Sequence, residues 1–218
     1  MSQVAAAPSP GPMPAGTSFL DERAKARAVL AVKAFEAKTS AELVVTVKKR
    51  VRPYEEAHRL WGIVFAFAGF VFLLFFPLDF DVALMPLDAL VAFASGYGLS
   101  RFLPPMERLA LGEKKRRETV EQAAKAAFYD LGVSKTTGRT GLLVFVSVFE
   151  RVVAIVADAG VTPEARKALD EAKADLEAAL VDVDIDAFSS RLEALGASFA
   201  PTMARAAEDV NELSDEVR

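Results

Sequence analysis

One stretch of this chain constrains its fold more than any other. Residues 60–78, LWGIVFAFAGFVFLLFFPL, include no charged side chain until the turn that follows them. A helix rises about 1.5 Å per residue, so a stretch of this length can span the hydrocarbon core of a bilayer, which is about 30 Å thick. A helix that is apolar on all sides would otherwise need a large protein around it. We therefore predict a transmembrane helix here.

A second apolar run follows at residues 87–103, LDALVAFASGYGLSRFL. Its two charged side chains, Asp88 and Arg101, lie near its two ends. A carboxylate in the first helical turn suits the positive end of the helix dipole, so we place Asp88 at the headgroups rather than in a proton or ion relay. The connector between the runs allows only a tight turn. Residues 58–103 are thus predicted to form an antiparallel transmembrane helical hairpin.

Basic residues flank this hairpin on both sides, and none lies between Arg59 and Arg101. By the positive-inside rule, both termini are expected in the cytoplasm. Basic side chains at these positions can also bind anionic lipid headgroups, so the bilayer is an expected partner. The net charge of −4 argues against nucleic-acid binding. The flanking residues are Lys48, Lys49, Arg50, Arg59, Arg101 and Arg108.

The chemistry open to the chain is narrowed by two residue types. There is no cysteine, which excludes disulfides, thiolate metal sites and cysteine nucleophiles. There is one histidine, His58, directly before the first predicted membrane helix. A Ser-His-Asp triad or a histidine-based zinc site would have to be built from this residue at the bilayer surface. We expect neither.

The rest of the chain reads as one α/β domain between two tails. A β-branched run at residues 42–48 predicts a strand, and residues 141–148 and 151–158 predict two strands joined by a short turn, hence an antiparallel pair. Helices are predicted near 20–38, over 106–131, from Thr162 and from Ile185. The predicted boundaries are a disordered tail at 1–17, the first part of the domain at 18–52, the hairpin at 58–103, the remainder at 106–205 and an acidic tail at 206–218.

An acidic stretch offers one candidate metal site. Asp182, Asp184 and Asp186 alternate, and Glu193 stands at the twelfth position counted from the first, as in a calcium loop. The sixth position is Ala187, where the sharp turn of such a loop needs glycine. The acidic N-terminus of a helix explains the pattern more simply.

Two further charged positions lie around the paired strands. Glu150 and Arg151 stand at the predicted turn between them, where we expect a solvated ion pair of little energetic value. Asp158 ends the last strand, a position that suits an active-site carboxylate, although Asp-Ala-Gly is also common turn chemistry. No glycine-rich nucleotide fingerprint is present.

Several of these segments together resemble a known family. They are TSAELVVTV, the membrane hairpin, FYDLGVSKTTGRTGLLVFVSVFERVVAIVADAGV and the terminal DVNELSDEV. In this order they look like the bacterial membrane-bound branch of the TPM domain family, named for thylakoid lumen, photosystem II repair and receptor-modulating members. The resemblance covers nearly all of residues 19–218. It implies a three-layer α/β fold, with a mixed sheet flanked by helices and the transmembrane hairpin inserted after the first strand.

The resemblance also implies candidate sites. Soluble members share Asp-Asn-Gly before the second strand, and the matching residues here are Arg139, Thr140 and Gly141. A cation in place of the acid removes an expected metal ligand, which leaves Glu42 and Asp158 as candidates for a calcium or magnesium site.

The activities that the family resemblance implies are acid phosphatase activity, metal binding and non-enzymatic help in the assembly or repair of membrane complexes. Because the acid is replaced, we expect no cofactor. We expect a non-enzymatic binding or assembly module at the cytoplasmic face of the bacterial inner membrane, with another membrane protein as partner. The alternative is a metal-dependent acid phosphatase that hydrolyses phosphomonoesters.

Overall fold

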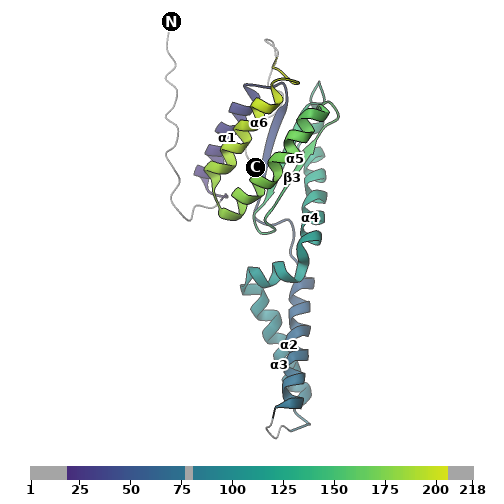
Figure 1. The fold of residues 1–218 in the computed structure, drawn as a ribbon. Helices are drawn as coiled ribbons and strands as arrows, with labels where there is room; N and C mark the ends of the chain where they lie inside the picture. Colours follow the sequence, from purple (N-terminus) through teal and green to yellow (C-terminus); the bar gives the residue numbers. More distant parts are fainter. Residues whose placement is uncertain (1–18, 77–80, 206–218) are drawn as a thin grey trace. The chain divides into compact units, whose positions relative to one another are not determined.

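A computed structural model of the chain describes residues 19–76 and 81–205. The two predicted tails and the centre of the hairpin connector lie outside these residues. The elements in chain order are α1 (Glu22–Glu36), β1 (Glu42–Lys48), α2 (Glu55–Phe75), α3 (Met85–Phe102), α4 (Pro104–Asp130), the short 3₁₀ helix η1 (Val133–Lys135), β2 (Gly141–Ser147), β3 (Val152–Ala157), α5 (Pro163–Asp182) and α6 (Ile185–Phe199) (Figure 1).

The three strands form one mixed sheet in the order β1-β2-β3. β2 and β3 are antiparallel, as their short connection predicts, with Phe145 opposite Ala154. β1 and β2 are parallel, with Val45 opposite Val144. A parallel pair needs a long crossover, and here the chain between the two strands contains α2, α3 and α4. The molecule is therefore a mixed α/β protein with a small sheet.

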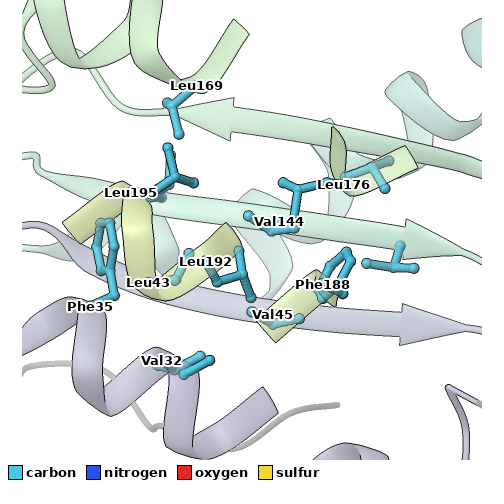
Figure 2. Close-up of a cluster of buried hydrophobic side chains, with 14 of the residues drawn as sticks. Val32, Phe35, Leu43, Val45, Val144, Leu169, Leu176, Phe188, Leu192 and Leu195 are labelled. Carbon is cyan, nitrogen blue, oxygen red and sulfur yellow. The ribbon is translucent and has the colours of Figure 1, made fainter. Parts of the chain in front are cut away.

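The main core lies on one face of this sheet. Alternate residues of a strand face the same side, and Leu142 and Val144 of β2 join buried side chains of α1, α5 and α6. Figure 2 shows side chains of β1 and β2 meeting those of the helices. Leu143 and Phe145, which alternate with them and so point to the opposite side of the sheet, are buried as well. The other face of the sheet is therefore also covered.

The C-terminal part of α4 has a buried side. Val120, Ala124 and Phe128 recur every four residues, so they lie on one side of the helix, and all three are buried. After α4 the chain turns at Gly132, whose φ of 72° is left-handed, as expected for the predicted helix end.

By its internal contacts the chain divides into two compact units. The first contains residues 1–49 and 120–218, and the second contains residues 50–119. We describe each by itself. α4 contributes to both, and it is not one continuous helix, because Gly112 has φ 66° and ψ 161°. The helix predicted over 106–131 is present as α4, with one break at this glycine, which adopts a conformation that other residues avoid.

In the second unit, α2 and α3 pack against each other along a line of small residues. Gly62 faces the ring of Phe93, and Gly69 faces the Cβ of Ala92. Among the described helices, α2 is the one that is long and apolar enough to cross a membrane, and 11% of its apolar window is buried. α3 does not reach the same combination of length and hydropathy.

Candidate functional site

The candidate carboxylate Asp158 lies directly after β3, beside the start of β2. Its backbone N–H donates to the carbonyl oxygen of Gly141 at 2.9 Å, which extends the antiparallel ladder by one residue. The strand pairing therefore brings Asp158 next to the loop that carries Arg139 and Thr140. This is the one end of the sheet where β1 and β2 begin and β3 ends.

An arginine of the chain itself binds this carboxylate. Arg139 has a left-handed backbone, with φ 52°, and its Nη2 donates to Asp158 Oδ1 at 3.0 Å. The backbone N–H of Ala159 donates to the same oxygen at 2.7 Å. The side chain of Asp158 is 5% exposed, whereas that of Arg139 is 65% exposed. The ion pair therefore joins a buried carboxylate to a cation that reaches it from the surface.

A second arginine holds the backbone of the same turn. The guanidinium of Arg166 donates from Nη2 to the carbonyl oxygen of Asp158 and from Nε to that of Val161, the latter at 3.1 Å. Gly160 packs so closely against the preceding loop that a Cβ on it would lie 2.2 Å from the carbonyl oxygen of Gly138. Two arginine side chains and one close backbone contact therefore stabilise the turn after β3.

Glu42, the second candidate ligand, begins β1 at the same end of the sheet. It lies opposite Gly141 in the parallel register, and it is 8% exposed. The structure therefore brings Glu42, the Arg139–Gly141 stretch and Asp158 to one sheet end, although they are far apart in the sequence.

These residues do not fit a calcium or magnesium ion. Ca²⁺ takes six to eight oxygen ligands, and Mg²⁺ demands an octahedral set. Among the described residues, no three side chains of the Asp, Glu, His or Cys types gather as a metal-binding group. Asp158 Oδ2 is buried and has no hydrogen-bond partner in the described part of the chain, but Oδ1 is already bound by Arg139. Arg139, which stands where the family resemblance implies an acidic ligand, donates to this carboxylate and brings a positive charge to it.

The acidic residues at the start of α6 cap this helix and pair with α1. The side chain of Asp184 accepts a hydrogen bond from the backbone N–H of Ala187 at 2.9 Å, which caps the helix. Arg27 of α1 donates to Asp186 at 3.2 Å and to Glu193 at 2.8 Å. Burial lowers the pKa of the Arg27 guanidinium, but its hydrogen bonds to Glu193 and Asp186 outweigh this, and the pKa is raised. These contacts support the interpretation of the acidic stretch as a helix N-terminus. Asp186 and Glu193 pair with Arg27.

The turn between β2 and β3 departs from its prediction. Glu150 is fully buried, with its carboxylate accepting a hydrogen bond from Ser147 Oγ, so it does not form a solvated pair with Arg151. The turn is also hydrogen-bonded to the end of β1, because the N–H groups of Val148 and Phe149 donate to the carbonyl oxygens of Lys48 and Lys49, each at 3.0 Å. Pairing with a segment about a hundred residues away buries a turn that looks solvated in the local sequence.

Sequence reasoning missed a buried polar cluster in the second unit. His58 Nδ1 lies 3.0 Å from Ser100 Oγ, and His58 Nε2 lies 3.9 Å from Glu107 Oε1. Arg50 Nη2 donates to Glu107 Oε2 at 2.7 Å. The Ser100 hydroxyl is fully buried and donates to the carbonyl oxygen of Tyr97 at 2.9 Å, so this is not a nucleophile presented to a substrate. The local sequence carries no clear signal for this cluster, because its members lie far apart in the sequence and charged residues such as Glu56 and Arg59 surround His58.

The basic residues that flank the hairpin differ in their surroundings. Arg50 pairs with Glu107, and the guanidinium of Arg101 lies 5.8 Å from the centre of the Tyr97 ring. Lys48, Lys49 and Arg59 are exposed, and Arg108 is half-buried.

The fold defines the class of protein, a mixed α/β protein with a three-stranded sheet. No family model and no curated protein matches the sequence. Among solved structures, it is similar to the NMR structure of the BA42 protein from the psychrophilic bacterium Bizionia argentinensis sp. nov.. The TM-score is 0.54, the sequence identity is 15%, and the match covers 92% of this chain and 94% of that one. At this identity the similarity shows the fold alone.

Proposed function

We propose that this chain is a TPM-like domain anchored in the bacterial inner membrane by a transmembrane helical hairpin. It acts as a non-enzymatic binding or assembly module for another membrane protein at the cytoplasmic face. The observation that carries the proposal is the exposure of the apolar side chains of α2, such as Phe67 at 68% and Phe75 at 82%.

This exposure favours a bilayer over water as the surroundings of α2. Large contiguous apolar patches are rare on monomeric soluble proteins and mark interaction sites or membranes. α3 adds exposed apolar side chains of its own, including Leu90 at 63% and Val91 at 57%. Two antiparallel crossings would place both ends of the hairpin on the same side of the membrane, from which the domain continues.

The residues near the ends of the hairpin support its orientation. Trp61 lies near the start of α2 and Tyr97 near the end of α3, and Trp and Tyr are enriched at the membrane–water boundary. Arg59 and Arg101 lie beside them in the sequence. Cytoplasmic segments carry the excess of basic residues, so this end of the hairpin faces the cytoplasm.

The arrangement of the first unit supports the family resemblance. α1, α5 and α6 share the core on one face of the sheet, residues on the other face are buried as well, and the C-terminal part of α4 has a buried side. Two covered faces are what the proposed three-layer TPM-like organisation requires. The hairpin follows β1 in the chain, at the point where the resemblance places the insertion.

The binding role is favoured over the phosphatase because of the charge at the sheet end. A metal-dependent phosphatase needs carboxylates available to a cation, and Asp158 is bound by Arg139 there. Because Arg139 engages this carboxylate, the non-enzymatic role is favoured over the phosphatase.

The test has two parts, both on the full-length chain in its membrane. First, the protein should remain in the membrane pellet after alkaline carbonate extraction. Second, crosslinking followed by purification in mild detergent should recover a membrane protein in stoichiometric amount. Release by carbonate would overturn the anchor. Robust phosphomonoester hydrolysis that is lost in Asp158→Asn would overturn the non-enzymatic role and favour the phosphatase.

A further inference from the structure

The segment between α3 and the break at Gly112 has an inverted pattern of exposure. Phe102 is 82% exposed and Leu109 is 73% exposed, whereas Glu107, between them, is 2% exposed. In a water-soluble protein, glutamate is almost never buried unless paired, and large apolar side chains tend to be covered. This segment hides its acid and presents its apolar side chains. We call residues 102–111 the interfacial segment.

Specific contacts within the second unit hold the segment in this orientation. Arg50 Nη2 donates to Glu107 Oε2 at 2.7 Å, which pairs the buried carboxylate. The indole N–H of Trp61 in α2 donates to the carbonyl oxygen of Met106 at 2.7 Å. On the same side Leu111 is 6% exposed. Because the inward side is fixed by an ion pair, a hydrogen bond and packing, Leu109 is held outward.

The two ends of the segment also set its direction. Its helical part begins with two prolines, which suit the first turn because their missing N–H groups would have no helical partner. It ends at Gly112, where the backbone leaves the helical region.

The residues around the segment indicate what contacts its exposed side chains. It follows directly the end of α3 that holds Tyr97 and Arg101, and it is bonded to Trp61 near the start of α2. Aromatic and basic residues at one end of an apolar hairpin are typical of the boundary between hydrocarbon and headgroups. The exposed Phe102 and Leu109 continue the apolar surface of the hairpin at this boundary.

We propose that the interfacial segment lies in the membrane–water interface, with Phe102 and Leu109 inserted among the upper acyl chains and Glu107 turned away from them. The partner is the bilayer itself, in the manner of a short interfacial helix. The segment sets the depth of the hairpin and marks where the chain leaves the membrane. This inference rests on the membrane anchor proposed above.

The chain has no cysteine, so single labels can be placed without background. Leu109→Cys would be labelled with an environment-sensitive fluorophore in the full-length protein, reconstituted in phosphatidylcholine–phosphatidylglycerol vesicles. Quenching by iodide in the water is compared with quenching by lipids that carry a nitroxide on the upper acyl chain. Phe67→Cys is the membrane-core control. Lys114→Cys, two residues beyond Gly112, and Leu30→Cys in α1 are the aqueous controls.

The expected result is strong quenching of Leu109→Cys by the shallow nitroxide and several-fold weaker quenching by iodide than at Lys114→Cys. Equal iodide quenching at the two positions, with Phe67→Cys still in lipid, would overturn this inference and leave the anchor standing. Quenching by neither reagent would mean that protein, such as a second copy, covers the segment, which also overturns it. If Phe67→Cys itself is quenched by iodide and not by lipid, the proposed anchor fails instead.

Discussion

At the scale of single residues, the backbone shows where the sequence departs from local preference. Val183 has φ 57°, a left-handed conformation that is an outlier for a β-branched side chain. It follows α5 in a Schellman arrangement, because Val183 N–H donates to the carbonyl oxygen of Leu180 and Asp184 N–H donates to that of Ala179. Glycine is the residue favoured at this position.

We predict that Val183→Gly stabilises the protein. The left-handed conformation costs an L-residue roughly 1–2 kcal/mol, and glycine avoids this cost. Glycine loses more chain entropy on folding, which destabilises the protein by about 0.5–1 kcal/mol, so the net stabilisation is about 1 kcal/mol. For a chain of this size the melting temperature should rise by roughly 2–4 °C. Val181→Gly, inside α5, is the matched control and should lower it. A lower melting temperature for Val183→Gly would contradict the argument.

The Arg139–Asp158 pair leads to a second prediction at this scale. Arg139→Asp replaces the cation beside the buried Asp158 carboxylate by a second carboxylate. The two negative charges repel each other until a divalent cation binds between them. Millimolar Ca²⁺ should then raise the melting temperature of the variant, because a ligand that binds only the folded state stabilises it. The unaltered chain and Arg139→Met should show no such shift. A Ca²⁺-dependent shift in the unaltered chain would mean that the arginine does not block the site.

At the scale of elements, the contact between α2 and α3 depends on where their glycines lie. A Cβ on Gly96 would lie 2.5 Å from the carbonyl oxygen of Trp61, whereas a Cβ on Gly98 would meet nothing within 4 Å. Gly96→Ala should therefore force the helices apart, at a typical overpacking cost of about 1–3 kcal/mol. Gly98→Ala should be neutral or slightly stabilising.

The single tryptophan of the chain, Trp61, lies at this contact and provides the measurement. Its fluorescence can follow thermal unfolding of the hairpin in detergent for both variants. Equal transitions for Gly96→Ala and Gly98→Ala would show that the helices do not approach as closely as described.

The elements also show what the sequence can and cannot predict. β1 occupies the predicted residues, and the caps at Thr162 and Asp184 lie where their side chains indicate, because each depends on a few neighbouring residues. The burial of Glu150 and the pairing of Glu107 with Arg50 could not be predicted in this way. Both depend on segments that are distant in the sequence, and local periodicity holds no information about them.

At the scale of the whole molecule, the two units follow different rules of burial. In the first, apolar side chains of the sheet and helices are covered, and charged side chains such as Lys167 and Glu171 remain at the surface. In the second, large apolar side chains such as Phe67 of α2 are exposed, whereas buried acids occur in both units, Glu150 in the first and Glu107 in the second. The first pattern suits water, and the second suits the membrane anchor proposed above.

This contrast leads to a prediction about the path of the chain. If α2 and α3 both cross the membrane, Asp81 before α3 and Lys114 after it must lie on opposite sides. A membrane-impermeant maleimide should label Asp81→Cys in spheroplasts and Lys114→Cys only in inside-out vesicles, together with Leu30→Cys in the first unit. The positive-inside rule sets this orientation, because the basic residues cluster at the end that Lys114 shares. Labelling of Asp81→Cys and Lys114→Cys in the same preparation would mean that α3 does not cross, and that α2 is the single span.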